Sequence, residues 1–252
     1  MKINDKKIYP ILFFLFLLIF LVFFTKNKIV SVNCASRFLT IESIVKKGTF
    51  AINEKHFFTI DKMVRDDSFF SSKPPVLSVI GAGIYYFLYN FLNLDFPETV
   101  EASEYLNTEN TAVYLITLIL IGGTFILLLF YFYKALNLFK IETNYKILLL
   151  LGLASGTLYL PYSTVLNNHI VAGCFLFISF YYLLKIKFGN LQAPKINFYF
   201  ILSGFFVSLS AVIDLPTGLI FLSLFFFYIW FFISKKKTIL YILAALPPII
   251  IH

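Results

Sequence analysis

Charged residues are scarce in this chain of 252 residues, and so are cysteine and tryptophan. Only 13% of the residues are Asp, Glu, Lys or Arg, and there are two cysteines and one tryptophan. By contrast, 60% are hydrophobic, 33 are Phe, and the mean hydropathy is +0.85. Because this number of charged residues is too small to cover the surface of a water-soluble domain, the composition predicts a polytopic, all-α membrane protein.

Several classes of site are missing from the sequence. Cys34 and Cys174 have no metal-ligand spacing, and Cys174 falls in an apolar segment, so neither a disulfide framework nor a zinc site is expected. We find no Walker loop, dinucleotide-binding glycine pattern, nucleophile elbow or zincin helix. The net charge of +8 lies in short loops without a basic stripe of stacking aromatics, so no nucleic-acid partner is expected.

Eight apolar segments organise the chain, each close to the ~20 residues that cross a bilayer. The first follows three lysines but has no small-residue cleavage site, so we interpret it as a retained membrane helix. The segments are 8–24, 76–94, 111–133, 147–160, 170–184, 197–213, 219–234 and 238–251.

Lysines favour one side of this arrangement. Three loops, at 134–146, 185–195 and 235–237, are lysine-rich and are separated from one another by two apolar segments, so they share a side that the positive-inside rule makes cytoplasmic. Loops 161–169 and 214–218 then face outward. Segment 95–110 agrees with an outer location because it has acidic residues and no Lys or Arg: Asp95, Glu98, Glu101, Glu104 and Glu109.

The N-terminal third is compatible with two topologies. In the first, residues 26–75 are outside and 76–94 does not cross, which gives seven spans. In the second, 76–94 crosses, the N-terminus is outside and the total is eight. Loop charge mildly favours the second, whereas the N-terminal lysines and the polar content of 76–94 favour the first.

Residues 36–75 form the only long polar stretch, and we expect the chemistry to lie there. An amphipathic helix pattern runs from Ser36, a candidate N-cap, to Gly48, a candidate C-cap, and is typical of a helix in the membrane interface. Residues 49–52 and 57–60 are β-prone and could pair as a hairpin. Lys73 precedes Pro74 and Pro75, which open an apolar helix, so a phosphate could bind to this lysine and the helix N-terminus.

Polar residues of the outer loops could support transfer from a lipid phosphate. Such a reaction needs a carboxylate to accept a hydroxyl proton, cations for the phosphate, and polar side chains that hold a sugar. The loops supply carboxylates that include Asp61, cations that include Arg37 and Lys73, and the polar residues Asn167, Asn168 and His169.

Short motifs in these loops resemble the GT-C membrane glycosyltransferases, a class that includes the protein O-mannosyltransferases and the lipid A aminoarabinose transferases. In the first loop the motifs are NCASRF at 33–38, KGTFAI at 47–52, TIDK at 59–62 and SSKPP at 71–75. LPYS at 160–163 and LNNH at 166–169 resemble the second outer loop, and DLPTG at 214–218 resembles a later turn of bacterial members.

The resemblance implies a GT-C-like module over residues 1–252 with about seven membrane helices. In this module residues 26–110 form an extracytoplasmic loop that contains juxtamembrane helices. The resemblance therefore favours the first topology. A further C-terminal part is expected. The implied activity transfers a sugar from a polyprenyl-phosphate donor to a glycan, lipid or protein acceptor outside the bacterial cytoplasmic membrane. Lys73 and Arg37 would bind the donor phosphate, and Asn167, Asn168 and His169 the substrate. No cofactor is required, although a divalent cation at Asp61, Asp66 or Asp67 is compatible with the sequence.

One departure from the family keeps other functions open. The family usually has an acidic residue before the Arg-aromatic pair, but residues 33–36 read NCAS, and Asn167 and Asn168 stand where many members place an Asp. Either Asp61 is the catalytic base, or transfer has been lost. The alternatives are a non-catalytic protein that binds or transports a polyprenyl-phosphate glycan, and a structural membrane subunit.

Overall fold

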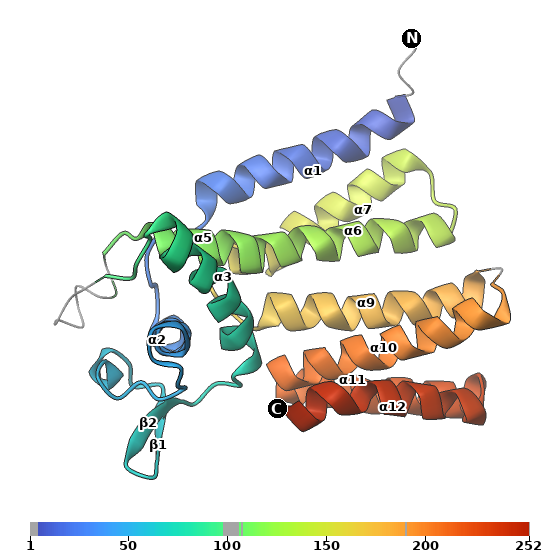
Figure 1. The fold of residues 1–252 in the computed structure, drawn as a ribbon. Helices are drawn as coiled ribbons and strands as arrows, with labels where there is room; N and C mark the ends of the chain where they lie inside the picture. The colour runs from blue at the N-terminus through green and yellow to red at the C-terminus, as the bar shows by residue number, and fades with distance from the viewer. Residues whose placement is uncertain (1–4, 98–105, 107, 190, 252) are drawn as a thin grey trace. The chain divides into compact units, whose positions relative to one another are not determined.

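A computed structural model describes residues 5–97, 106, 108–189 and 191–251. The chain divides into two compact units (Figure 1). The first comprises residues 1–20, 124–161 and 168–252, and the second comprises 21–123 and 162–167. The predicted outer acids Glu98, Glu101 and Glu104 lie outside the described residues.

Each of the eight predicted apolar segments contains a helix. The helix at 111–138 is continuous and comprises α5 (Thr111–Thr117), the π-helical η2 (Leu118–Gly122) and α6 (Gly123–Leu138). The other seven are α1 (Asp5–Phe24), α3 (Val76–Leu92), α7 (Thr143–Ser155), α9 (His169–Phe188), α10 (Ala193–Ile213), α11 (Leu215–Phe232) and α12 (Lys235–Ile251).

Not every predicted span has the expected length. Among the described residues, four helices are long and apolar enough to cross a bilayer: 111–138, α9, α10 and α11. The expectation for 147–160 was wrong, because α7 ends at Ser155, before Gly156 and the short α8 (Tyr159–Tyr162). Its 13 residues cover about 20 Å at 1.5 Å per residue, less than the ~30 Å hydrocarbon core. The chain is therefore a helical membrane protein, and its seven-span count stays a prediction.

The first unit packs α9, α11 and α12 against α10. Phe200 and Val207 of α10 are fully buried and share a core with Tyr241 of α12. Gly204 lets the two backbones approach, since a Cβ there would lie 2.1 Å from the Tyr241 carbonyl oxygen. The buried Ser179 hydroxyl of α9 donates to the Ser203 carbonyl of α10 at 2.8 Å. Small residues and hydroxyl bonds of this kind hold helices together in lipid.

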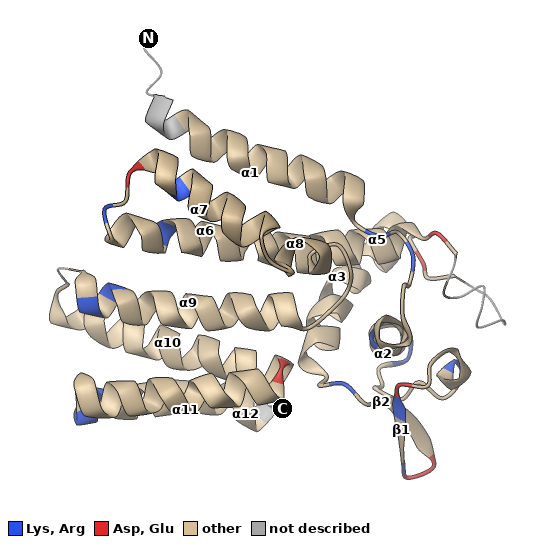
Figure 2. Cartoon of the chain, turned by 180° about the vertical axis from the view of Figure 1, so that it is seen from behind, with Lys and Arg blue, Asp and Glu red and all other residues tan. Residues whose placement is uncertain are grey.

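The three lysine-rich loops lie at one end of this unit, as predicted (Figure 2). Phe139, after α6, and Phe188, at the end of α9, have ring centroids 5.2 Å apart. Lys187 of α9 lies 5.9 Å from the Tyr228 ring of α11, and Lys237 of α12 hydrogen bonds to Asn197 of α10. We refer to this end of the unit as the lysine end.

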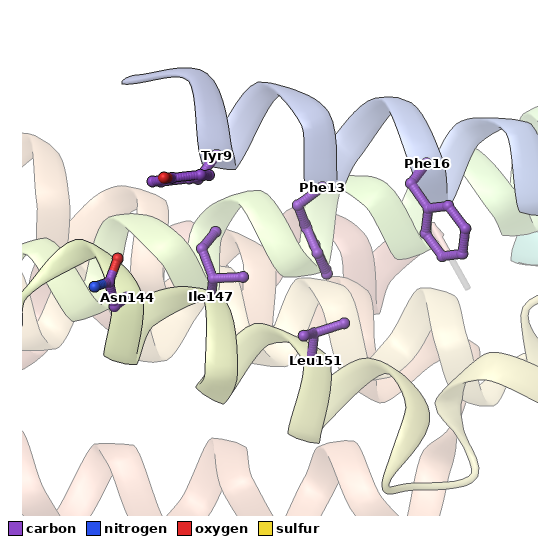
Figure 3. Close-up of a pocket in the computed structure, with 6 residues that line it drawn as sticks. All are labelled: Tyr9, Phe13, Phe16, Asn144, Ile147 and Leu151. Carbon is purple, nitrogen blue, oxygen red and sulfur yellow. The ribbon is translucent and has the colours of Figure 1, made fainter. Parts of the chain in front are cut away.

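The N-terminal part of α1 also belongs to the lysine end. A groove between α1 and α7 is lined by Tyr9, Phe13 and Phe16 of α1 and by Asn144, Ile147 and Leu151 of α7, and the two sets of residues follow the groove in the same direction (Figure 3). The two helices therefore run in the same direction. Because α7 begins at Thr143, within the lysine-rich stretch 134–146, α1 begins at the lysine end too.

In the second unit, helix α2 (Val32–Lys47) begins earlier than predicted. Its N-cap is Ser31, whose hydroxyl accepts the Cys34 N–H, and not Ser36. The predicted C-cap Gly48 is confirmed, with φ of +67°. Residues 34–43 are buried on every side, including Arg37 and Glu42, so α2 lacks the open polar face that its amphipathic pattern indicates.

The hairpin of the second unit lies after the predicted one. Strand β1 (Lys62–Arg65) pairs antiparallel with β2 (Ser68–Ser71), whereas residues 56–58 form a 3₁₀ turn, η1 (His56–Phe58). Asp66 and Asp67 supply the two positive φ angles, +50° and +57°, that a two-residue turn requires. The prediction was wrong because these aspartates, which adopt the left-handed conformation more readily than most residues, were interpreted only as charge. Of the predicted first strand, Ala51 forms an isolated bridge to Phe70.

Helix α3 packs across α2. A Cβ at Gly81 would lie 2.6 Å from the Ile41 side chain, so glycine permits this close approach. Phe96, after α3, contacts the rings of Phe38 and Tyr85 at centroid distances of 5.6 and 4.4 Å. These aromatic rings hold α2 and α3 together.

Candidate functional site

Asp61 and Lys73 form an ion pair in the second unit. Asp61 lies between η1 and β1, and Lys73 lies between β2 and Pro75, the N-cap of α3. The Lys73 Nζ is 3.1 Å from the Asp61 Oδ1, which also accepts a hydrogen bond from Ser72. The hairpin therefore brings together two of the predicted site residues that are twelve positions apart.

The backbone around this pair is fixed by serines. The Ser36 hydroxyl of α2 donates to the Asp61 carbonyl at 2.7 Å and lies 2.5 Å from the Ser71 hydroxyl. The Asp61 side chain is only 11% exposed, and its Oδ2 is buried with no hydrogen-bond partner among the described residues. A buried carboxylate oxygen normally has a partner, so this oxygen is positioned to accept a further donor.

Arg37 lies in the core of α2 and is 4% exposed. Its Nη1 donates to the Asn33 carbonyl at 3.3 Å. The predicted second cation is therefore present next to Ser36, but it is far less accessible than Lys73, whose side chain is 28% exposed.

The 162–167 turn belongs to the same unit as Asp61 and Lys73. The Lys26 N–H donates to the Thr164 carbonyl at 2.9 Å, and the Cys34 thiol donates to the Leu166 carbonyl at 3.1 Å. The Asn167 amide donates to the Tyr162 and Val165 carbonyls at 2.6 and 2.8 Å. The structure thus joins the two predicted loops, and the Asn167 amide stabilises the turn between them.

Asn168 and His169 fall in the first unit, at the start of α9. The His169 Nδ1 lies 2.8 Å from the Asp214 Oδ2, at the junction of α10 and α11. The imidazole is 63% exposed and the carboxylate 14%. This pairing was not predicted, because 45 residues separate two groups that had been assigned to different loops.

An ion network that the sequence did not reveal holds α2 to the residues after α3. Glu42 pairs with Lys46 at 3.1 Å and with Lys55 at 2.8 Å. Lys46 also pairs with Asp95 at 2.7 Å, and the Tyr85 hydroxyl donates to Asp95 at 2.5 Å. Only the i,i+4 spacing of Glu42 and Lys46 was visible in the sequence.

Contacts within this network shift the pKa of Asp95 and that of Lys46. Burial alone would raise the pKa of Asp95, but hydrogen bonds from Lys46, Tyr85 and the Phe96 N–H outweigh it and lower the pKa. Burial alone would lower the pKa of Lys46, but its bonds to Asp95 and Glu42 raise it. Both groups are held in their charged forms, which is typical of a structural ion pair.

The candidate cation ligands are not clustered. Asp66 and Asp67 form the exposed hairpin turn, apart from the Asp61 and Lys73 pair. In the part of the chain that the structure describes, no group of three or more His, Cys, Asp or Glu side chains could hold a metal ion.

No protein-family model, curated protein or solved structure matches this chain.

Proposed function

We propose that the chain is a membrane glycosyltransferase that moves a sugar from a polyprenyl-phosphate donor to a glycan, lipid or protein acceptor on the extracytoplasmic side. The observation that supports this best is the ion pair of Lys73 and Asp61 at the start of helix α3. It combines a cation for a phosphate with a carboxylate for a hydroxyl proton, next to a helix whose first N–H groups favour an anion.

The distribution of lysines supports the sidedness of this proposal. The positive-inside rule places the lysine end of the first unit in the cytoplasm, and α1 begins at that end. A crossing α1 then delivers residues after Phe24, including Asp61 and Lys73, to the outer side. With α3 not crossing, seven spans also require the helices 111–138, α9, α10, α11 and α12 to cross, together with the segment 143–162, which contains the short helices α7 and α8.

In the proposed reaction the donor phosphate binds Lys73 and displaces Asp61 from it. The acceptor oxygen forms a bond with the anomeric carbon of the sugar, the bond from that carbon to the phosphate oxygen breaks, and polyprenyl phosphate leaves. Asp61 accepts the proton of the acceptor hydroxyl. Lys73 stabilises the charge that develops on the phosphate. The burial of Arg37 makes Lys73 the first cation that the phosphate meets.

The residues predicted to bind the substrate in the 162–169 turn are divided between the two units. Asn168 and His169 provide hydrogen-bonding groups for the sugar, and Asp214 orients the His169 ring. The Asn167 amide is committed to the carbonyls of its own turn, so in this proposal Asn167 shapes the loop that faces the substrate.

A second candidate function is non-catalytic binding or transport of the polyprenyl-phosphate glycan. Two observations favour it: residues 33–36 contain no carboxylate, and the Asp61 Oδ1 is already bound to Lys73 and Ser72. A carrier-binding protein would need the cation but not a proton acceptor.

Two substitutions separate these functions, with undecaprenyl phosphate as the binding probe and transfer of label from polyprenyl-phosphate sugars in membranes as the activity assay. Lys73→Ala should weaken probe binding by about 10-fold or more, because a lost charged contact costs about 1.5–3 kcal/mol. Lys47→Ala is the matched control, since Lys47 is exposed and pairs with Glu54. An affinity that Lys73→Ala leaves unchanged would refute the phosphate site.

Asp61→Asn tests the chemistry separately from binding. The amide keeps the size of the side chain but cannot accept a proton, so transfer should be lost while probe binding is retained. Retained binding together with sugar-lipid flux and no covalent product would support the carrier function instead.

A further inference from the structure

A second apolar groove of the first unit lies between α9 and α11. It has a volume of about 250 Å³, and Leu183 and Phe225, which are 3% and 9% exposed, form its buried wall. The Phe180 and Phe225 rings stack across it at a centroid distance of 6.1 Å. The residues that line it are Phe180, Leu183, Leu184, Lys187, Leu224, Phe225 and Tyr228.

One charged side chain lines this groove, and it is a cation. Lys187 is in the last turn of α9, at the lysine end, and its Nζ lies 5.9 Å from the centroid of the Tyr228 ring on the opposite wall. No acidic residue is among those lining the groove. The groove therefore has a wholly apolar body and a positive charge at one end.

We propose that this groove binds one acyl chain of an anionic phospholipid, with the lipid phosphate on Lys187. The apolar body suits a hydrocarbon chain, and the cation lies where α9 ends, at the level expected for a headgroup. Basic groups between membrane helices on the cytoplasmic side recognise anionic headgroups in this way. The site is independent of the proposed transferase reaction, because none of its residues takes part in it.

The grooves beside α1 provide an internal comparison. One is lined by Tyr9, Phe13 and Phe16 of α1 with residues of α7, and a second by α1 and α6 residues that include Ile126 and Phe130. Among the side chains that the structure describes, neither groove is lined by a charged one. Both should accept lipid chains without a preference for headgroup charge.

Quenching of a single tryptophan by brominated lipids tests the proposal on the full chain. Trp230 is the only tryptophan, so Trp230→Phe gives a silent background into which Leu224→Trp, at the rim of the groove, introduces a reporter. In mixed vesicles, brominated phosphatidylglycerol should occupy the site about 5-fold more strongly than brominated phosphatidylcholine, as expected for one lysine near an anionic headgroup.

Further variants identify the source of this preference. Lys187→Gln should abolish it, Lys187→Arg should retain it, and Lys146→Gln, which removes a lysine that binds Asn137 outside the groove, should leave it unchanged. Ile147→Trp in the Trp230→Phe background reports on the α1 groove and should show no preference. Equal quenching by the two lipids at Leu224→Trp, or a preference that survives Lys187→Gln, would overturn the proposal.

Discussion

Replacement of Gly204 by alanine should separate helices α10 and α12. The new Cβ would lie 2.1 Å from the Tyr241 carbonyl oxygen and 3.1 Å from its Cα. Carbon and oxygen atoms normally stay about 3.3–3.6 Å apart, so the backbones must move by about 1 Å. A gap of that size forfeits a quarter to a half of the dispersion energy along the interface.

The expected loss of stability follows from two opposing effects. Overpacking a tight core costs about 1–3 kcal/mol and sometimes more, and backbone atoms cannot rotate away as a side chain could. The higher helix propensity of alanine offsets at most about 1 kcal/mol of this loss of stability. Because the contact is with backbone, we expect a net loss near the upper end, about 2 kcal/mol.

Thermal unfolding in detergent, followed by circular dichroism, measures this effect. Gly152→Ala in α7 is the matched control, since a Cβ there meets nothing within 4 Å, and it should leave stability unchanged or raise it by up to about 1 kcal/mol. If Gly204→Ala proves as stable as Gly152→Ala, α10 and α12 do not cross as described.

Two further predictions concern the second unit. Because the pKa of Asp95 is lowered in the folded chain, its contribution to stability is present above about pH 4 and is lost as the pH falls through the folded pKa. The pKa of Lys46 is raised, so its contribution to stability is present below about pH 10 and is lost as the pH rises further. Asp95→Asn should therefore reduce the fall in melting temperature between pH 6 and pH 3, and an unchanged fall would exclude this pair as its source. Asn110→Ala should lower the free energy of unfolding by about 1–2 kcal/mol. The Asn110 side chain accepts the Val113 N–H at 3.0 Å as N-cap of the 111–138 helix, and it donates to the Asp95 carbonyl at 2.8 Å. A melting temperature equal to that of the unaltered chain would contradict this prediction.

Local and compositional features were predictable from the sequence. The helices followed from apolar segments, the C-cap at Gly48 from the conformational freedom of glycine, and the shared end of the lysine-rich loops from alternation of the chain direction. The pairing of Lys73 with Asp61 was not predicted, although both residues were selected as site candidates. Its geometry depends on the hairpin, whose register is set by two aspartates at positive φ.

Long-range polar contacts could not be predicted, because no local pattern encodes them. Lys46 meets Asp95 across 49 positions, and His169 meets Asp214 across 45. The buried state of Arg37 also escaped prediction, since helical spacing places it on the polar side of α2. On that side Glu42 pairs with Lys55 and Lys46 pairs with Asp95, contacts that helical spacing does not reveal.

The structure also determines how the sidedness of the polar loop should be measured. Cys34 is 5% exposed, its thiol donates to the Leu166 carbonyl, and burial raises its pKa despite the opposing effects of Ser31 and Arg37. Cys174 is also buried. Neither thiol is suited to surface labelling, so a new cysteine is required.

Labelling of Glu54→Cys in intact cells by a membrane-impermeant thiol reagent tests the proposed topology most directly. The Glu54 side chain is 73% exposed, and Lys236→Cys, at the start of α12, is the control for the lysine end. We predict that Glu54→Cys reacts in intact cells and that Lys236→Cys reacts only after permeabilisation. If Glu54→Cys also requires permeabilisation, the Asp61 and Lys73 pair is cytoplasmic, and the extracytoplasmic transferase is contradicted.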